Sequence, residues 1–128
     1  MKTNYFLLLP LFLLLIGCGE SATDNALQEY IPGTYTRQSV GEFGKSWDTI
    51  IISLQNKEAK QYKITRRWKY DRVLDGKPIE PEYKVTETSG TYNPETKALQ
   101  ETETLDFFTF DPVKKLLFEG SNQFNKIK

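Results

Sequence analysis

Histidine is absent from the 128-residue chain, and cysteine occurs only once, at Cys18. The protein therefore has no imidazole to serve as a general base or a metal ligand, and a single thiol cannot form an internal disulfide. Catalysis would have to rest on carboxylate, lysine, tyrosine or serine side chains alone. These absences favour a protein that is not an enzyme, and they give no reason to expect a metal or another cofactor.

An excess of charge is also absent. Residues 1–17 contain one charged side chain, Lys2, and the rest of the chain carries 16 basic and 17 acidic side chains. A nearly neutral chain offers no electrostatic reason to bind nucleic acid. The length suits one domain with a modest core, and the 14 aromatic residues after residue 17 favour a β-rich interior.

One short hydrophobic run stands at the N-terminus. Lys2 is followed by an almost unbroken apolar stretch from Tyr5 to Ile16, which is the layout of a secretory signal. A membrane-spanning helix needs about 20 apolar residues, and this shorter run is also interrupted by Pro10. The sequence therefore predicts an export signal over residues 1–17 that is removed from the mature protein.

The run ends in Leu15-Ile16-Gly17-Cys18, which resembles the lipobox of bacterial lipoproteins. The resemblance implies that Cys18 becomes the first mature residue and carries a diacylglycerol, whose acyl chains (palmitate, for example) hold the protein on a membrane. One acyl chain binds only marginally, whereas two or three give lasting attachment. Gly19 stands where an aspartate retains enterobacterial lipoproteins at the inner membrane, so the resemblance implies the outer membrane, on either face. The alternatives are a free thiol in an ordinary signal peptide and an uncleaved anchor.

The rest of the chain divides into a short polar segment and a β domain. Residues 18–31 are mostly small or polar, and we interpret them as the lipidated N-terminus and a flexible tether with a reach of about 20 Å. From residue 32 to residue 128 apolar and polar residues alternate, which is the period of strands. The sequence therefore predicts an all-β fold, an antiparallel up-and-down meander of about eight short strands.

Two segments of the chain resemble each other at a spacing of 18 residues, "TYNPETKAL" (91–99) and "TFDPVKKLL" (109–117). In each, an Asn or Asp can accept a hydrogen bond from the backbone that follows, and a proline presets φ for the turn. We expect two hairpin turns in which the aromatic residue before the turn and the leucine after it face the same core. Successive hairpins of this kind indicate a meander.

The order of the short strands, the lipobox and the opening Gly33-Thr34-Tyr35 together resemble small lipocalin-like lipoproteins of bacteria. Tyr35 occupies the tryptophan position of the Gly-x-Trp signature of lipocalins. The resemblance implies that the meander closes into a small barrel or half-barrel, and it names no ligand.

Arg66 is the most unusual charge in the predicted strands because it shares a face with Trp68. A charge among apolar side chains is costly unless it is paired. If Tyr70 lies opposite Tyr83, antiparallel register places Arg66 opposite Glu87, and we expect a structural ion pair between these two residues. The alternative is that Arg66 lines a cavity and holds an anionic ligand group.

Five aromatic residues are further candidates for contacts with a ligand or partner. Tyr62, Trp68 and Tyr70 share the face of Arg66 and would line a barrel interior. Phe43 and Trp47 belong to or follow the glycine-containing segment 41–46 and would cover the opening of such a barrel.

Glu101 and Glu103 are the nearest approach to a catalytic pair of carboxylates. Side chains two apart on a strand point the same way, whereas glycosidases place their two acids on either side of the sugar. We therefore interpret both as solvated charges that guard an edge strand.

These observations predict a lipid-anchored binding protein of the cell envelope without catalytic activity, which contacts an envelope protein partner through loops or a strand edge. One alternative is a carrier of a small apolar or anionic amphipathic ligand in the barrel interior. Another is an immunity or inhibitor lipoprotein. An enzyme that uses Glu101 or Asp48 ranks last.

The lipobox generates a direct prediction about the native polypeptide. We expect a chain that begins at Cys18 and is heavier than its amino-acid sequence by the mass of the attached lipid, as measured by mass spectrometry of protein purified from membranes. A native chain with an unmodified thiol, or with residues 1–17 still attached, would contradict the assignment to the envelope.

Overall fold

The computed structural model of the protein describes residues 22–128, so the predicted signal and Cys18 lie outside the described residues. One helix and nine strands make up this part of the chain: α1 (Ala22–Tyr30), β1 (Gly33–Gly41), β2 (Gly44–Asn56), β3 (Gln61–Leu74), β4 (Lys77–Pro78), β5 (Glu82–Asn93), β6 (Ala98–Glu101), β7 (Phe107–Asp111), β8 (Leu116–Glu119) and β9 (Asn122–Lys126). The helix is short, and no helix among these residues is long and apolar enough to cross a membrane.

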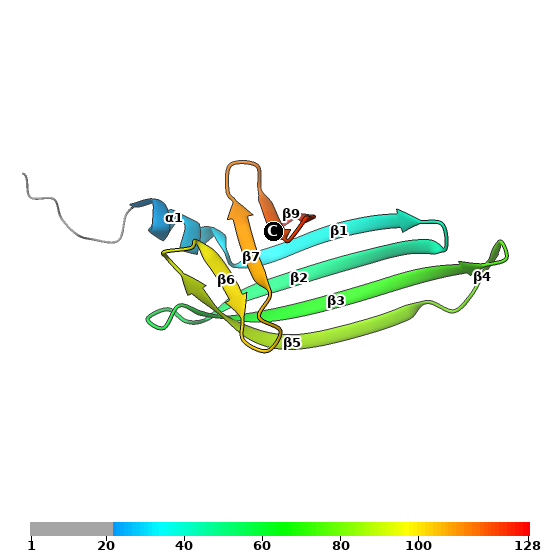
Figure 1. The fold of residues 1–128 in the computed structure, drawn as a ribbon, viewed down its shortest axis with the longest axis horizontal. Coiled ribbons are helices and arrows are strands. Elements are labelled where there is room, and N and C mark those ends of the chain that lie inside the picture. Colours follow the sequence, from blue (N-terminus) through cyan, green and yellow to red (C-terminus); the bar gives the residue numbers. More distant parts are fainter. Residues whose placement is uncertain (1–21) are drawn as a thin grey trace, which may run out of the picture.

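Eight of the strands form a closed antiparallel barrel in simple up-and-down order (Figure 1). Each strand pairs with the next along the chain, and β9 returns to pair with β1. The two-residue β4 is an extra strand that pairs only with the end of β3, at Val73 and Leu74. The predicted all-β meander and its closure are confirmed.

The helix α1 corrects the prediction of a flexible tether. Residues 22–30 are helical, and Leu27 and Ile31, which are 8% and 0% exposed, belong to the hydrophobic core. Tyr35 fixes this end of the helix, because its hydroxyl donates to the carbonyls of Ile31 at 2.8 Å and Tyr30 at 3.1 Å. The helix was missed because its nine residues contain one large aliphatic side chain, Leu27, and so show no repeating apolar stripe.

The hydrophobic core fills the part of the barrel next to α1. Inward-facing residues of the strands alternate with outward-facing ones, and the largest of the fully buried side chains come from almost the whole circumference: Tyr35, Tyr62, Tyr92, Phe108 and Phe124. Lys126 of β9 shares the inward face of Phe124 and lies at this end of the core, with its ammonium 4.0 Å from the ring centre of Tyr30 and 5.6 Å from that of Tyr35. The predicted aromatic core is therefore densely packed and does not enclose a cavity.

Three hairpin turns share one construction. The two predicted turns are confirmed, because Asn93 accepts from the amide of Glu95 at 2.9 Å and Asp111 accepts from that of Val113 at 3.1 Å. The turn between β2 and β3 is a third copy, in which Asn56 accepts from Ala59 at 3.0 Å. Four residues after each Asn or Asp stands a lysine with left-handed backbone: Lys60 (φ 53°), Lys97 (φ 55°) and Lys115 (φ 57°).

The strands of the barrel differ greatly in length. β1, β2, β3 and β5 have 9, 13, 14 and 12 residues, whereas β6, β7, β8 and β9 have 4, 5, 4 and 5. Because β9 pairs with β1 only at Tyr35 and Thr36, the long strands continue beyond the closed barrel as a four-stranded ribbon (Figure 1). We call this ribbon, residues 37–47 and 67–87, the projecting end. It lies at the opposite end of the molecule from α1.

The position of Leu27 in the core predicts a stability effect that a flexible tether would not show. We expect Leu27→Ala to lower the free energy of unfolding by about 2–3 kcal/mol, because it leaves a cavity between α1 and the barrel. Urea unfolding of residues 22–128 measures this loss. The control Asn25→Ala changes an exposed residue of the same helix and should stay within about 0.5 kcal/mol of the parent. Equal stability of both variants would contradict the packing of α1.

Candidate functional site

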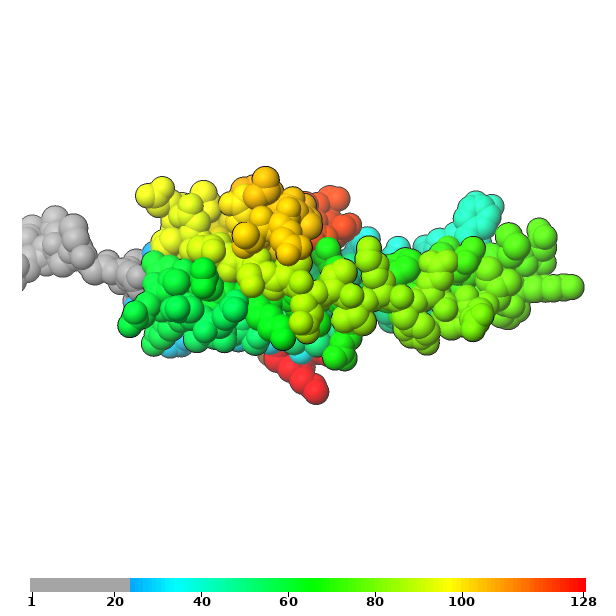
Figure 2. Space-filling view, turned by 90° about the horizontal axis from the view of Figure 1, so that it is seen from below, coloured from blue at the N-terminus to red at the C-terminus, as the bar shows by residue number. Residues whose placement is uncertain are grey.

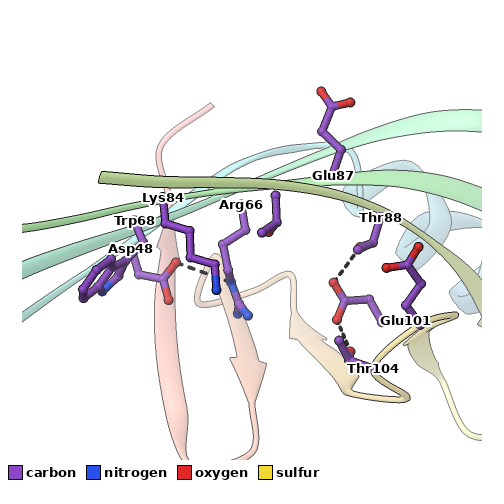
Figure 3. A pocket seen from close by; sticks show the side chains of 10 residues that line it. Asp48, Arg66, Trp68, Lys84, Glu87, Thr88, Glu101 and Thr104 are labelled. Atoms are coloured by element: carbon purple, nitrogen blue, oxygen red, sulfur yellow. Dashed lines mark hydrogen bonds and ion pairs between the residues drawn. The ribbon is translucent and has the colours of Figure 1, made fainter. Parts of the chain in front are cut away.

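The most prominent concave feature is a cleft of about 710 Å³ where the projecting end meets the closed barrel. On one side the cleft is bounded by the inner faces of β2, β3 and β5, and on the other by the turn that follows β6 (Figure 3). Nine of the ten residues that line it have polar or charged side chains, although much of the surface that they present is that of their carbon atoms: Asp48, Arg66, Trp68, Lys84, Thr86, Glu87, Thr88, Glu101, Glu103 and Thr104.

Arg66 forms the floor of the cleft and is held by two carboxylates. Its Nη2 donates to Oε2 of Glu119 at 2.5 Å, and its Nε lies 3.5 Å from Oδ1 of Asp48. The guanidinium carbon also lies 5.9 Å from the ring centre of Phe108, at the top of the hydrophobic core. Burial opposes the charge of the guanidinium, but the bond to Glu119 and the nearby carboxylates outweigh it and raise the pKa of Arg66. Arg66 is thus a permanent cation.

Of the two carboxylates beside Arg66, Asp48 has the longer contact with the guanidinium. Burial raises its pKa, while the charges of Arg66 and Arg37 act in the opposite direction without cancelling the effect. Its Oδ1 is buried and accepts no hydrogen bond. Arg66 thus contacts two acids, Asp48 and Glu119, and Arg37 of β1 also acts on Asp48 from the neighbouring strand.

Glu101 is the most deeply buried charged residue of the described chain, at 5% exposed. One carboxylate oxygen accepts from the hydroxyl of Thr88 at 2.7 Å and the other accepts from the hydroxyl of Thr104 (Figure 3). The interpretation of Glu101 as a solvated edge charge was therefore wrong. It points inward because it stands two residues after the buried Leu99, whereas Glu103 lies in the following turn and is exposed.

The predicted Arg66–Glu87 ion pair is also wrong. Arg66 lies opposite Thr86, and Tyr70 lies opposite Glu82 and not Tyr83. This shift of one residue puts Glu87 on the outer face, where its carboxylate lies 3.4 Å from the ammonium of Lys63. Figure 3 shows Glu87 pointing away from the cleft. The anionic partners of Arg66 come instead from β2 and from the distant β8.

The candidate aromatic residues lie in three different places. Trp68 lines the cleft, and Tyr70 stacks on it with ring centres 5.6 Å apart. Tyr62 is in the core, where its hydroxyl donates to the carbonyl of Gln28 at 3.4 Å. Phe43 and Trp47 belong to the projecting end: Phe43 is 63% exposed, and Trp47 lies on the outer face, beneath the ammonium of Lys69. The structure thus brings together only Arg66, Trp68 and Tyr70.

Sequence reasoning missed Glu119, Lys84, the contact of Asp48 with Arg66 and the buried role of Glu101. The alternation of the strands contained a signal for the acids, because Asp48, Glu101 and Glu119 stand two residues from the buried Ile50, Leu99 and Leu117. Each carboxylate was therefore placed on an inward face by its own strand.

Acidic side chains outnumber basic ones in the cleft. Arg66 is already engaged by Asp48 and Glu119, so it is poorly placed to capture an external anion. Glu101 and Glu103 add acidic groups, and Lys84 reaches into the cleft from β5 (Figure 3). Among residues 22–128, no group of three or more His, Cys, Asp or Glu side chains is suited to hold a metal ion.

No protein-family model matches the chain, and no curated protein or solved structure matches it either.

The pairing of Arg66 predicts a pH-dependent loss of stability. We expect Arg66→Met to lower the free energy of unfolding by about 2–3 kcal/mol at roughly pH 7, because Asp48 and Glu119 remain largely buried without a counter-charge. The folded-state pKa of Asp48, which burial already raises, then rises further above its value in the unfolded chain. Stability from such groups is present at low pH and is lost as the pH rises through the folded pKa, so the deficit shrinks toward about pH 4.

Urea unfolding across this pH range tests the prediction, with Arg67→Met as the matched control. Arg67 is the next residue of β3 and points to the exposed outer face. A deficit of Arg66→Met that does not change with pH, or that Arg67→Met reproduces, would contradict the role assigned to the ion pairs.

Proposed function

We propose that this protein is a lipid-anchored binding protein of the bacterial cell envelope, without catalytic activity, that engages an envelope protein through its projecting end. The observation that carries the proposal is the exposure of large apolar side chains on that end. Val40, Phe43 and Leu74 at its tip are 68%, 63% and 58% exposed. Scattered apolar residues are common on protein surfaces, but a group of them at one site is typical of an interaction surface.

The shape of the projecting end supports the same proposal. Figure 2 shows the ribbon as a narrow arm that leaves the thicker barrel. On the outer face Tyr83 and Val85 are 69% and 63% exposed. Nothing in the described chain covers these side chains, and a partner protein would bury them.

The packing of the barrel weighs against a carrier of a ligand in the closed interior. Carriers in this size range need a cavity of about 300 Å³ or more. Here the closed part is filled by fully buried aromatic and aliphatic side chains, including Tyr35, Tyr62 and Phe124. A partner module has no need of such a cavity, because it binds with its surface.

The position of the anchor fits this mode of binding. Cys18 lies four residues before α1, and α1 lies at the opposite end of the molecule from the projecting end (Figure 1). A lipid on Cys18 would therefore direct the projecting end away from the membrane surface, toward a partner in the aqueous compartment. This orientation holds on either membrane face.

The acidic residues considered for catalysis are engaged in other interactions. Asp48 lies beside Arg66, and Glu101 is bound by Thr88 and Thr104. These contacts hold both carboxylates in place, which supports a binding protein. An immunity or inhibitor lipoprotein is one form of this function, in which the partner is a toxin or an enzyme.

A small ligand in the open cleft is the second candidate function. Its volume of about 710 Å³ is large enough for a drug-sized molecule, and Trp68 offers an aromatic wall. An anionic amphipathic ligand is disfavoured, because the acids that surround Arg66 would repel it.

Affinity capture tests the proposed function. We expect the lipidated wild-type protein to retain an envelope protein from detergent-solubilised membranes, and Phe43→Ser to reduce its recovery about tenfold, because central aromatic contacts contribute strongly to interfaces. The Phe43 side chain is exposed, so the variant should fold normally. The control Val113→Ser alters a residue that is 92% exposed on the turn between β7 and β8, away from the projecting end, and should leave recovery unchanged.

Native mass spectrometry of the same preparations separates the two candidate functions. A small molecule that co-purifies with the wild-type protein, together with no captured protein, would contradict the partner proposal and favour a ligand in the cleft.

A further inference from the structure

We infer that the free edge of β5 over residues 82–87 binds an extended segment of the partner by strand addition, with a basic side chain of that segment entering the cleft. This inference rests on the proposed function and specifies how the partner is held.

The edge is free because β5 is longer than β6, its neighbour on that side. Along one side, residues 82–91 pair with β3, whereas β6 pairs only with Gly90 to Asn93 on the other. The carbonyl of Ser89 is also occupied, since the amide of Thr102 donates to it at 2.9 Å. Residues 82–87 therefore present a row of backbone donors and acceptors that an extended peptide can satisfy.

The outer face of this edge is suited to apolar side chains. Tyr83 and Val85 alternate along it, and both are more than half exposed. Behind them Trp47, Lys69 and Tyr83 form a row across three paired strands, and the ammonium of Lys69 lies 5.1 Å from the ring centre of Trp47 and 5.8 Å from that of Tyr83. A partner strand would therefore place every second side chain against this surface.

The inner face of the edge is suited to a basic side chain. The acids at the two ends of the segment are already paired, Glu82 with Arg72 at 2.7 Å and Glu87 with Lys63 at 3.4 Å. Inside the cleft, acidic side chains are not matched one to one by basic ones. Asp48, Glu101, Glu103 and Glu119 face three cations, Arg66, Lys84 and Arg37, which lies opposite Asp48 on β1, so the acids remain in excess.

Glu103 is the acid best placed to meet a basic group from outside. It is exposed in the turn after β6, and it lines the same cleft as Thr86. A lysine or arginine of an added strand opposite Thr86 would enter between them. Such a group would also offset the excess of acids in the cleft.

Two other occupants are less suited to this edge. A second copy of the chain would bring two negatively charged clefts together, and like charges across an interface are unfavourable. The edge of β1, residues 37–41, is also free beyond its pairing with β9, but it is shorter and does not line the cleft.

Two synthetic peptides test the inference on residues 22–128, which include the complete barrel and its core. The probes are acetylated Thr-Val-Arg-Val-Arg-Val-Arg-Val-Thr and the same peptide with glutamate in place of arginine. We expect the arginine peptide to bind saturably in the micromolar range and to shift the NMR resonances of the backbone amides of residues 82–87. The glutamate peptide should not bind at the same concentrations.

Backbone methylation of the arginine peptide tests strand addition itself. The amides of its valines all face one edge of the extended peptide, and those of its arginines face the other. N-methylation of one of these two sets should therefore abolish binding, while N-methylation of the other leaves it intact. Equal effects of both sets would overturn the inference.

Charge reversal tests the role of the cleft. We expect Glu103→Lys to weaken binding of the arginine peptide about tenfold, since it replaces an attraction by a repulsion. The control Glu95→Lys reverses another exposed acid, in the turn between β5 and β6, and should change binding little. Equal effects of the two variants would overturn the assignment of the cleft.

Other outcomes are equally decisive. Shifts confined to residues 37–41, binding of the glutamate peptide as tightly as the arginine peptide, or no binding of either peptide at millimolar concentration would each overturn strand addition at β5. If a partner is still captured from membranes through Phe43, only this inference fails and the proposed function stands. If no partner is captured either, both fail.

Discussion

The unequal length of its strands is the constraint on which this structure depends. A barrel can close only over the part that all of its strands share, and here the four C-terminal strands contribute four or five residues each. The additional residues of the four long strands, β1, β2, β3 and β5, have no short strands opposite them. They therefore extend beyond the barrel as a ribbon with two free edges and an uncovered inner face. The cleft, the exposed tip and the open edge of β5 all follow from this mismatch.

Arg66 and its partners Asp48 and Glu119 lie at the boundary between the closed barrel and the projecting end. On the side of α1 the interior is dry and filled, with Ile50, Ile64 and Phe108 no more than 1% exposed. At the next inward position toward the projecting end, β2 carries Asp48 and β3 carries Arg66. Other strands also carry polar residues at this level. At this height water can reach the interior from the cleft, so charged groups lose less hydration than they would in the core. The ion pairs therefore close off the hydrophobic core where the barrel opens.

Local features of the fold could be predicted from the sequence, but features that depend on distant partners could not. The turns at Asn93 and Asp111 were predictable because the turn residues and their hydrogen bonds lie within five positions of each other. The Arg66–Glu87 pair failed because strand register depends on the long connection between β3 and β5, in which Pro78 and Pro81 give no fixed spacing. Likewise, nothing near Arg66 in the sequence points to Glu119, 53 residues away.

A free strand edge is a hazard as well as a binding site, because it can pair with other copies of the protein. Residues 82–87 pair with β3 without a bulge and contain no proline, so the backbone itself gives no protection. Protection comes from side chains: Lys84 stands near the middle of the edge, and the acidic cleft lies beside it. Two copies that approach edge to edge bring these like charges together, whereas a partner with basic side chains meets the acids favourably. The same charges that discourage self-association would also favour the basic partner segment proposed above.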